Sequence, residues 1–201
     1  MKKIISVILS IMVAAFVFAG CASSVAKPVE EVSATTLNIM KDGRIISTIV
    51  EDFSESYYDQ TEMTEEINSE INSFNATHES DSVVLNSVSV ANQIAKVQMT
   101  FKNADIYSEF TKEFLFVGTV KEALDTGKDL KVTLKVPGSE NETIGMTEIY
   151  QMSSEYIVIS GEKIHIRCEG KPIYISEDIR VVDEYEIDAY ENADDTIIIF
   201  K

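Results

Sequence analysis

Apolar residues recur along this chain with two different spacings, one of which predicts helices and the other strands. Within residues 60–75 the apolar positions are separated by four, four and three residues, which places them along one side of a helix. They are Met63, Ile67, Ile71 and Phe74. Asp59 and Glu62 stand three residues apart just before this run, as at a capped helix N-terminus. Residues 95–101 instead alternate between apolar and polar, as in a strand of a sheet that is wet on one side.

Turn residues divide the rest of the first half into hairpins and short helices. Asp42-Gly43 lies between apolar runs and predicts a hairpin. A second hairpin is predicted for residues 83–101, with its turn at Asn92-Gln93. Residues 105–116 are interpreted as a short irregular helix. Thr119 and Glu122 have the spacing of a capping box, which predicts the start of another helix.

Beyond Leu130 the pattern indicates short strands separated by turns. The strands are expected near residues 131–136, 144–150, 156–160, 163–168, 172–175, 179–182, 185–189 and 196–200. Residues 156–160 and 163–168 are predicted to form a third hairpin across Gly161-Glu162. The chain is therefore expected to be an α+β protein, with a helix-bearing first half that contains β-hairpins and a nearly all-β, antiparallel second half. A subdomain boundary, if the body is divided, is placed near residues 127–130.

The first twenty residues have the features of a secretory signal peptide. Met1-Lys2-Lys3 is positively charged, and the apolar run at residues 4–17 is shorter than the roughly 20 residues of a membrane-spanning helix. No later segment has a long uncharged apolar run. Residues 1–20 are therefore expected to be removed on export, residues 21–35 to form a flexible tether, and residues 36–201 to form the folded body.

The residues around Cys21 make the export prediction more specific. Phe18-Ala19-Gly20-Cys21 resembles the lipobox of bacterial lipoproteins, although that family usually has Leu, Val or Ile where this chain has Phe18. The resemblance implies cleavage before Cys21 and a diacylglycerol on its thiol, and hence a lipid-anchored, extracytoplasmic protein whose partner is the membrane lipid. The alternative is an ordinary signal cut nearby, with Cys21 incidental. The tether and small acidic body also loosely resemble uncharacterised surface lipoproteins of Gram-positive Firmicutes.

The net charge and the number of cysteines limit which partners and which cross-links are expected. The formal net charge of −17 argues against a nucleic-acid partner. If Cys21 is lipidated, Cys168 has no cysteine left to pair with, so no intramolecular disulfide is expected. Cys168 shares a strand face with Ile164 and Ile166, and is therefore interpreted as a buried apolar residue.

Catalytic and metal-binding patterns are sparse in this sequence. His78 lies in a polar stretch interpreted as a solvated loop, and His165 lies on the polar face of its predicted strand. The chain contains no Gly-x-Ser-x-Gly, His-Glu-x-x-His or phosphate-loop motif. The acidic clusters on the main helix and at residues 183–188 are interpreted as solvated faces. We therefore assign no catalytic residue, no metal site and no cofactor.

Two groups of residues are candidates for binding. Lys163, His165 and Arg167 form a small basic face on one predicted strand, which either receives an acidic ligand or, as we favour, pairs with the protein's own carboxylates. Tyr57 and Tyr58 form a second candidate surface, because Tyr is common in binding sites, although packing at the rim of the core is the simpler interpretation.

The sequence thus favours a non-enzymatic interaction or accessory module, with an envelope or surface protein as its partner. The alternatives are a small binding protein for a peptide, sugar or ion, and an extracellular hydrolase that uses carboxylates. A groove beside the basic face would favour a binding protein, whereas an open sheet face would favour the interaction module.

Overall fold

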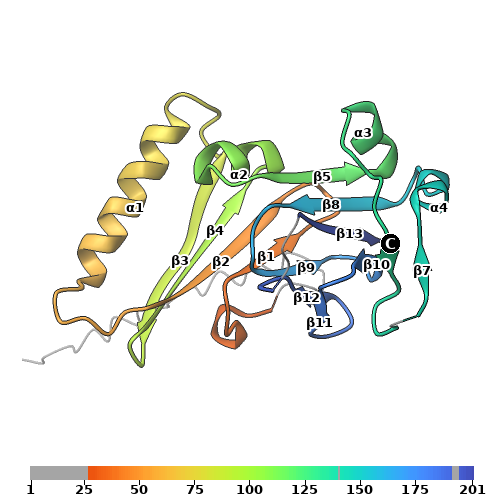
Figure 1. Ribbon diagram of the computed structural model, residues 1–201. Coiled ribbons are helices and arrows are strands. Elements are labelled where there is room, and N and C mark those ends of the chain that lie inside the picture. The colour runs from red at the N-terminus through yellow and green to blue at the C-terminus, as the bar shows by residue number, and fades with distance from the viewer. Residues whose placement is uncertain (1–26, 140, 192–194) are drawn as a thin grey trace, which may run out of the picture.

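A computed structural model describes residues 27–139, 141–191 and 195–201 of the chain (Figure 1). These residues form two β-sheets. Sheet A has seven strands in the order β11-β12-β9-β1-β2-β4-β3, and sheet B has six strands in the order β5-β8-β13-β10-β6-β7. The strands of sheet A are β1 (Thr36–Ile39), β2 (Ile45–Asp52), β3 (Val83–Ala91), β4 (Ile94–Phe101), β9 (His165–Cys168), β11 (Arg180–Val181) and β12 (Glu186–Asp188). The strands of sheet B are β5 (Leu115–Thr119), β6 (Leu134–Lys135), β7 (Thr143–Ile144), β8 (Tyr156–Ser160), β10 (Pro172–Ser176) and β13 (Thr196–Phe200).

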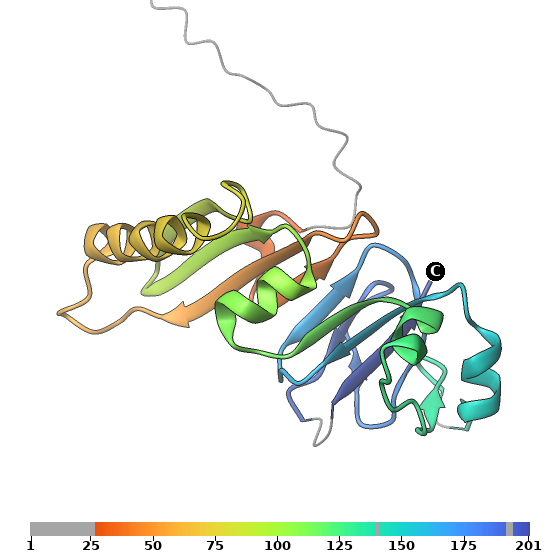
Figure 2. The same cartoon turned by 90° about the horizontal axis from the view of Figure 1, so that it is seen from above.

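Helices cover parts of both sheets. The helices are the 3-10 turn η1 (Val29–Glu31) and the α-helices α1 (Gln60–Asn75), α2 (Ala104–Thr111), α3 (Val120–Asp125) and α4 (Met146–Gln151). The longest helix, α1, packs on β3 at the end of sheet A that extends away from sheet B (Figure 2). The structure confirms the predicted α+β class.

Two apolar cores lie on opposite faces of sheet B. The main core lies between sheets A and B, where Leu37, Phe101 and Ile166 from sheet A pack in one cluster with Val158 and Ile198 from sheet B. The second core lies beneath α3 and α4. It contains Val120, Ala123, Leu130, Leu134, Ile149, Ile157, Ile159, Ile197 and Ile199. Sheet B is therefore apolar on both faces, which explains the uninterrupted run Ile197-Ile198-Ile199 in β13.

Several local predictions are confirmed. Asp59 caps α1 by accepting hydrogen bonds from the backbone N–H groups of Thr61 and Glu62. The hairpin turn at Asn92-Gln93 has both residues at positive φ, as a tight two-residue turn between twisted strands requires. Thr119 and Glu122 form the expected capping box at the start of α3.

The predicted third hairpin is wrong. Strand β8 pairs with β5 and β13 in sheet B, whereas β9 pairs with β1 and β12 in sheet A. The chain crosses from one sheet to the other between Ser160 and His165, so Gly161-Glu162 is part of a crossover rather than of a turn. The pairing of β9 with β1 is also parallel, whereas the other strand pairings of the second half are antiparallel within the described residues.

Two other boundaries differ from the predictions. The predicted strand at residues 144–150 is mostly the helix α4, whose first turn is stabilised where Glu148 accepts a hydrogen bond from the backbone N–H of Gly145. The predicted helix at residues 105–116 ends at Thr111, because Lys112 adopts a left-handed conformation with φ of 68° and the chain then enters β5. In both cases the segment is a short apolar run, and the spacing of apolar residues in so short a run is compatible with a helix or a strand.

Candidate functional site

The outer face of sheet A, which is turned away from the main core, is polar across several strands. Leu37 and Ile39 of β1 point into the core, so Thr36 and Asn38 lie on the outer face. Thr36 stands beside His165 of β9 on one side and beside Thr48 of β2 on the other. This alternation places the basic residues of β9 on the outer face, away from Cys168, which is buried in the core.

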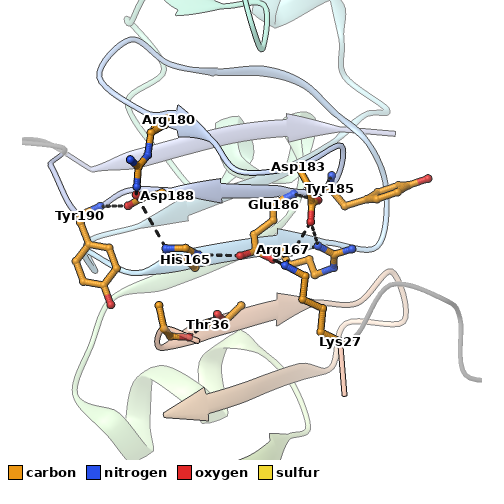
Figure 3. Close-up of polar contacts among 11 residues, drawn as sticks. Lys27, Thr36, His165, Arg167, Arg180, Asp183, Tyr185, Glu186, Asp188 and Tyr190 are labelled. Atoms are coloured by element: carbon orange, nitrogen blue, oxygen red, sulfur yellow. Dashed lines mark hydrogen bonds and ion pairs between the residues drawn. The ribbon is translucent and has the colours of Figure 1, made fainter. Parts of the chain in front are cut away.

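A cluster of charged side chains occupies the β9–β12 end of this face (Figure 3). We call it the outer-face cluster. The pairing register places Arg167 opposite Glu186 and His165 opposite Asp188, so basic and acidic side chains face each other across neighbouring strands. The cluster consists of Lys27, His165, Arg167, Arg180, Asp183, Glu186 and Asp188.

Glu186 is the centre of the cluster. Its carboxylate lies 2.7 Å from Nδ1 of His165, 2.6 Å from Nζ of Lys27 and 3.1 Å from Nη1 of Arg167. Only 3% of Glu186 is exposed, so its charge depends on these partners rather than on water.

The two aspartates are held by both backbone and side-chain donors. Asp183 accepts hydrogen bonds from the backbone N–H groups of Tyr185 and Glu186, and its other oxygen lies 2.7 Å from Nη1 of Arg167. Asp188 accepts from the backbone N–H of Tyr190 and forms an ion pair with Arg180. Both aspartates are thus fixed in place.

The electrostatic balance of the cluster keeps its carboxylates ionised. Burial raises the pKa of each of the three acids, but hydrogen bonds and the nearby positive charges outweigh it. The pKa values of Asp183, Glu186 and Asp188 are all lowered as a result. The acids that the sequence indicated as a solvated face therefore divide by position. Glu184 is exposed, whereas Glu186 and Asp188 are buried in ion pairs.

The structure separates the three basic candidates. His165 and Arg167 are paired with the protein's own carboxylates, in line with the favoured interpretation of the basic face. Lys163 precedes β9 and is exposed. It lines a different surface hollow together with Asp129, Gly161 and Asp195. The sequence did not identify Lys27 or Arg180 as members of the cluster, because neither neighbours β9 along the chain.

The tyrosine candidates lie at the opposite end of sheet A, in the loop between β2 and α1. Tyr57 is 72% exposed and Tyr58 is 43% exposed, so neither packs in the core. His78, which was interpreted as a solvated loop residue, instead stacks on Phe74 and lies 3.1 Å from Glu109. Hydrogen bonding to the Phe74 carbonyl and pairing with Glu109 raise the pKa of His78. Cys21 lies outside the described residues.

Neither a metal-binding cluster nor a membrane-spanning helix is present within the described ranges. There, no group of three or more His, Cys, Asp and Glu side chains is arranged to hold a metal ion. Over the same ranges, no helix has both the length and the apolar character needed to span a bilayer. No protein family, curated protein or solved structure was found that matches this chain.

Proposed function

We propose that this chain is a lipid-anchored, extracytoplasmic lipoprotein whose folded body acts as a non-enzymatic interaction module close to the membrane. The signal-like first twenty residues and the lipobox-like Phe18-Ala19-Gly20-Cys21 support the anchor. Two acyl chains on Cys21 would bind the membrane stably, since each buried methylene contributes about 0.8 kcal/mol.

The attachment of Lys27 to sheet A is the observation that carries the proposed position near the membrane. Lys27 follows Cys21 by six residues and forms ion pairs with Glu186 and Asp183. Nζ of Lys96 holds the next turn by donating hydrogen bonds to the carbonyls of Val29 and Glu30. An extended chain spans at most roughly 3.5 Å per residue, so the body would start within about 20 Å of the lipidated residue.

The outer-face cluster supports an interaction module over a ligand-exchanging site. Arg167 forms ion pairs with Glu186 and Asp183, and His165 lies within hydrogen-bond distance of Glu186, so the polar groups of this face are used to fix its own strands. Such internal pairing suits a rigid sheet that presents its surface to a partner. A receptor for an acidic ligand would need Arg167 to leave its carboxylates, with a large cost from the buried charges that remain.

The anchor is tested with the full chain expressed in a bacterial host that is fed an alkyne-tagged fatty acid. The wild-type protein should incorporate the label and partition into the detergent phase, and Cys21→Ala should incorporate none. Cys168→Ala is the matched control, because Cys168 is buried in the core and should leave labelling unchanged. Label that persists in Cys21→Ala, or is lost in Cys168→Ala, would contradict the proposal.

A further inference from the structure

The loop between β2 and α1 lies at the end of the molecule farthest from sheet B (Figures 1 and 2). It carries three aromatic side chains, of which two are exposed and one is partly buried. We call Phe53, Tyr57 and Tyr58 the aromatic tip. Phe53 stacks on Tyr58 with ring centroids 4.8 Å apart, and Tyr57 meets Tyr58 edge-on at 4.8 Å. Rings that pack on one another while remaining open to water are typical of interaction surfaces.

The loop that carries the tip is held by hydrogen bonds at each of its ends. The backbone N–H of Phe53 donates to the carbonyl of Gln93 in the neighbouring hairpin, at 2.7 Å. The side chain of Asp52 accepts from both the backbone and the hydroxyl of Ser54, and Asp59 caps α1. The rings are thus positioned before any partner arrives, which lowers the entropic cost of binding.

The chain segments that flank the tip are rich in acidic residues. The lysine on the adjoining strand β4, Lys96, pairs with Val50 in the sheet and donates hydrogen bonds to the carbonyls of Val29 and Glu30. Residues 45–95, which include β2, α1 and β3, contain ten Asp and Glu residues and no Lys or Arg. In the loop and its flanks these acids are Glu51, Asp52, Glu55 and Asp59. Among the described residues, none of these four forms an ion pair, in contrast to the acids of the outer-face cluster.

We infer that the aromatic tip is a docking surface for a Lys- and Arg-rich segment of a partner protein, an inference that rests on the proposed role as an interaction module. The faces of Tyr and Phe rings attract ammonium and guanidinium groups. The unpaired carboxylates around the rings supply complementary charge. A second copy of this chain would bring the same negative charge to the tip, so a basic partner fits the surface better.

The inference is tested on the mature protein in neutral detergent, with a fluorescein-labelled peptide of alternating Lys and Arg as the probe. Fluorescence anisotropy should show binding that weakens as salt is added. The double variant Tyr57→Ala/Tyr58→Ala should bind at least about fivefold more weakly, given the usual strength of exposed cation–π contacts. Tyr150→Ala is the matched control: Tyr150 is 41% exposed on α4, and its loss should change affinity less than about twofold.

A second pair of variants separates a specific site from attraction to net charge. Glu51→Gln/Glu55→Gln should weaken peptide binding, whereas Glu177→Gln/Asp178→Asn removes the same charge from an exposed loop after β10 and should not. Equal losses in both pairs, or no effect of the tyrosine variant, would overturn the inference. Tip-dependent binding of a neutral oligosaccharide in place of the peptide would also overturn it. Peptide binding is measured without reference to the lipid. A negative result in the fatty-acid labelling experiment would therefore contradict the lipid anchor and leave the binding inference standing.

Discussion

At the scale of single residues, the main energetic feature is that a nearly buried carboxylate, Glu186, is surrounded by three positively charged or titratable groups. Removing charges from water is costly, and pairing repays that cost only when the geometry is good. Here the contacts of Glu186 with Lys27, His165 and Arg167 lie between 2.6 and 3.1 Å. The network therefore fixes β9, β12 and the segment at Lys27 relative to one another. It adds less to net stability than its number of contacts suggests.

Glu186→Gln is expected to destabilise the fold by about 2–4 kcal/mol. The substitution removes the negative charge that pairs with Arg167 and Lys27 at a buried position. Urea denaturation of the purified protein measures this change. Glu184→Gln is the matched control, since Glu184 lies two residues away with a side chain that is 58% exposed. Its ion pair with Lys171 should contribute less than about 1 kcal/mol. Equal effects of the two variants would contradict the proposed burial of the network.

The same residues predict that the body loses stability in acid. The pKa values of Asp183 and Asp188 are lowered from 3.8 and that of Glu186 from 4.5, so these carboxyls bind protons more readily in the unfolded chain. Their contribution to stability is complete above those values and is lost as the pH falls through the lower folded values. The thermal midpoint should therefore drop below about pH 4.5.

The variants of the preceding test check this assignment. Glu186→Gln should show a shallower fall of the thermal midpoint as the pH drops below about 4.5, because one of the titrating groups is gone. Glu184→Gln should retain the wild-type profile, since its exposed carboxylate is not part of the buried network. Identical profiles for all three proteins would place the acid sensitivity elsewhere.

At the scale of elements, the sequence was informative where a signal was local. The stripe of α1, its cap at Asp59 and the turn at Asn92-Gln93 depend on neighbouring residues, and all three are confirmed. The separation of β8 and β9 into different sheets could not be predicted, because each strand finds its partners far away along the chain. Such pairing leaves no mark in the spacing of apolar residues.

The candidate site shows the same division. Alternation correctly placed His165 and Arg167 on a polar face opposite Cys168. Their acidic partners were recognised in the sequence as an acidic cluster at residues 183–188. The spacing of residues, however, does not distinguish a solvent-exposed acid from one that forms an ion pair. The register of β12 against β9 decides this, since it brings Glu186 opposite Arg167.

Gly170 shows how closely two elements approach. A Cβ atom there would lie 1.8 Å from the backbone carbonyl oxygen of Lys201, at the end of the central strand β13. Gly170→Ala should therefore push the end of β13 away and destabilise the protein by about 2 kcal/mol or more, as measured by thermal or urea unfolding. Gly161→Ala should change stability by less than about 0.5 kcal/mol, because the nearest atom to its Cβ would be 3.7 Å away. A tolerated Gly170→Ala would contradict this packing.

At the scale of the whole molecule, the two halves of the chain are combined in both sheets. Sheet A joins β1 and β2 from the first half to β9, β11 and β12 from the second. Sheet B begins with β5, which precedes the predicted boundary at residues 127–130, and continues with β8, which follows it. The main core likewise includes residues from both halves, such as Phe101 and Phe200.

This arrangement predicts that the halves do not fold independently. A fragment of residues 22–128 would lack β9 beside β1 and β8 beside β5, and would expose much of the main core. We expect the amide NMR spectra of this fragment and of the fragment of residues 129–201 to be poorly dispersed. Each fragment lacks most of the strands that pair with its own apolar strands. The intact residues 22–201 should unfold in urea in one transition, with the same midpoint by secondary-structure and tertiary-structure signals. A well-dispersed spectrum and cooperative unfolding of either fragment would show that the boundary near residues 127–130 separates independent subdomains, which would make the shared core a docking contact between them.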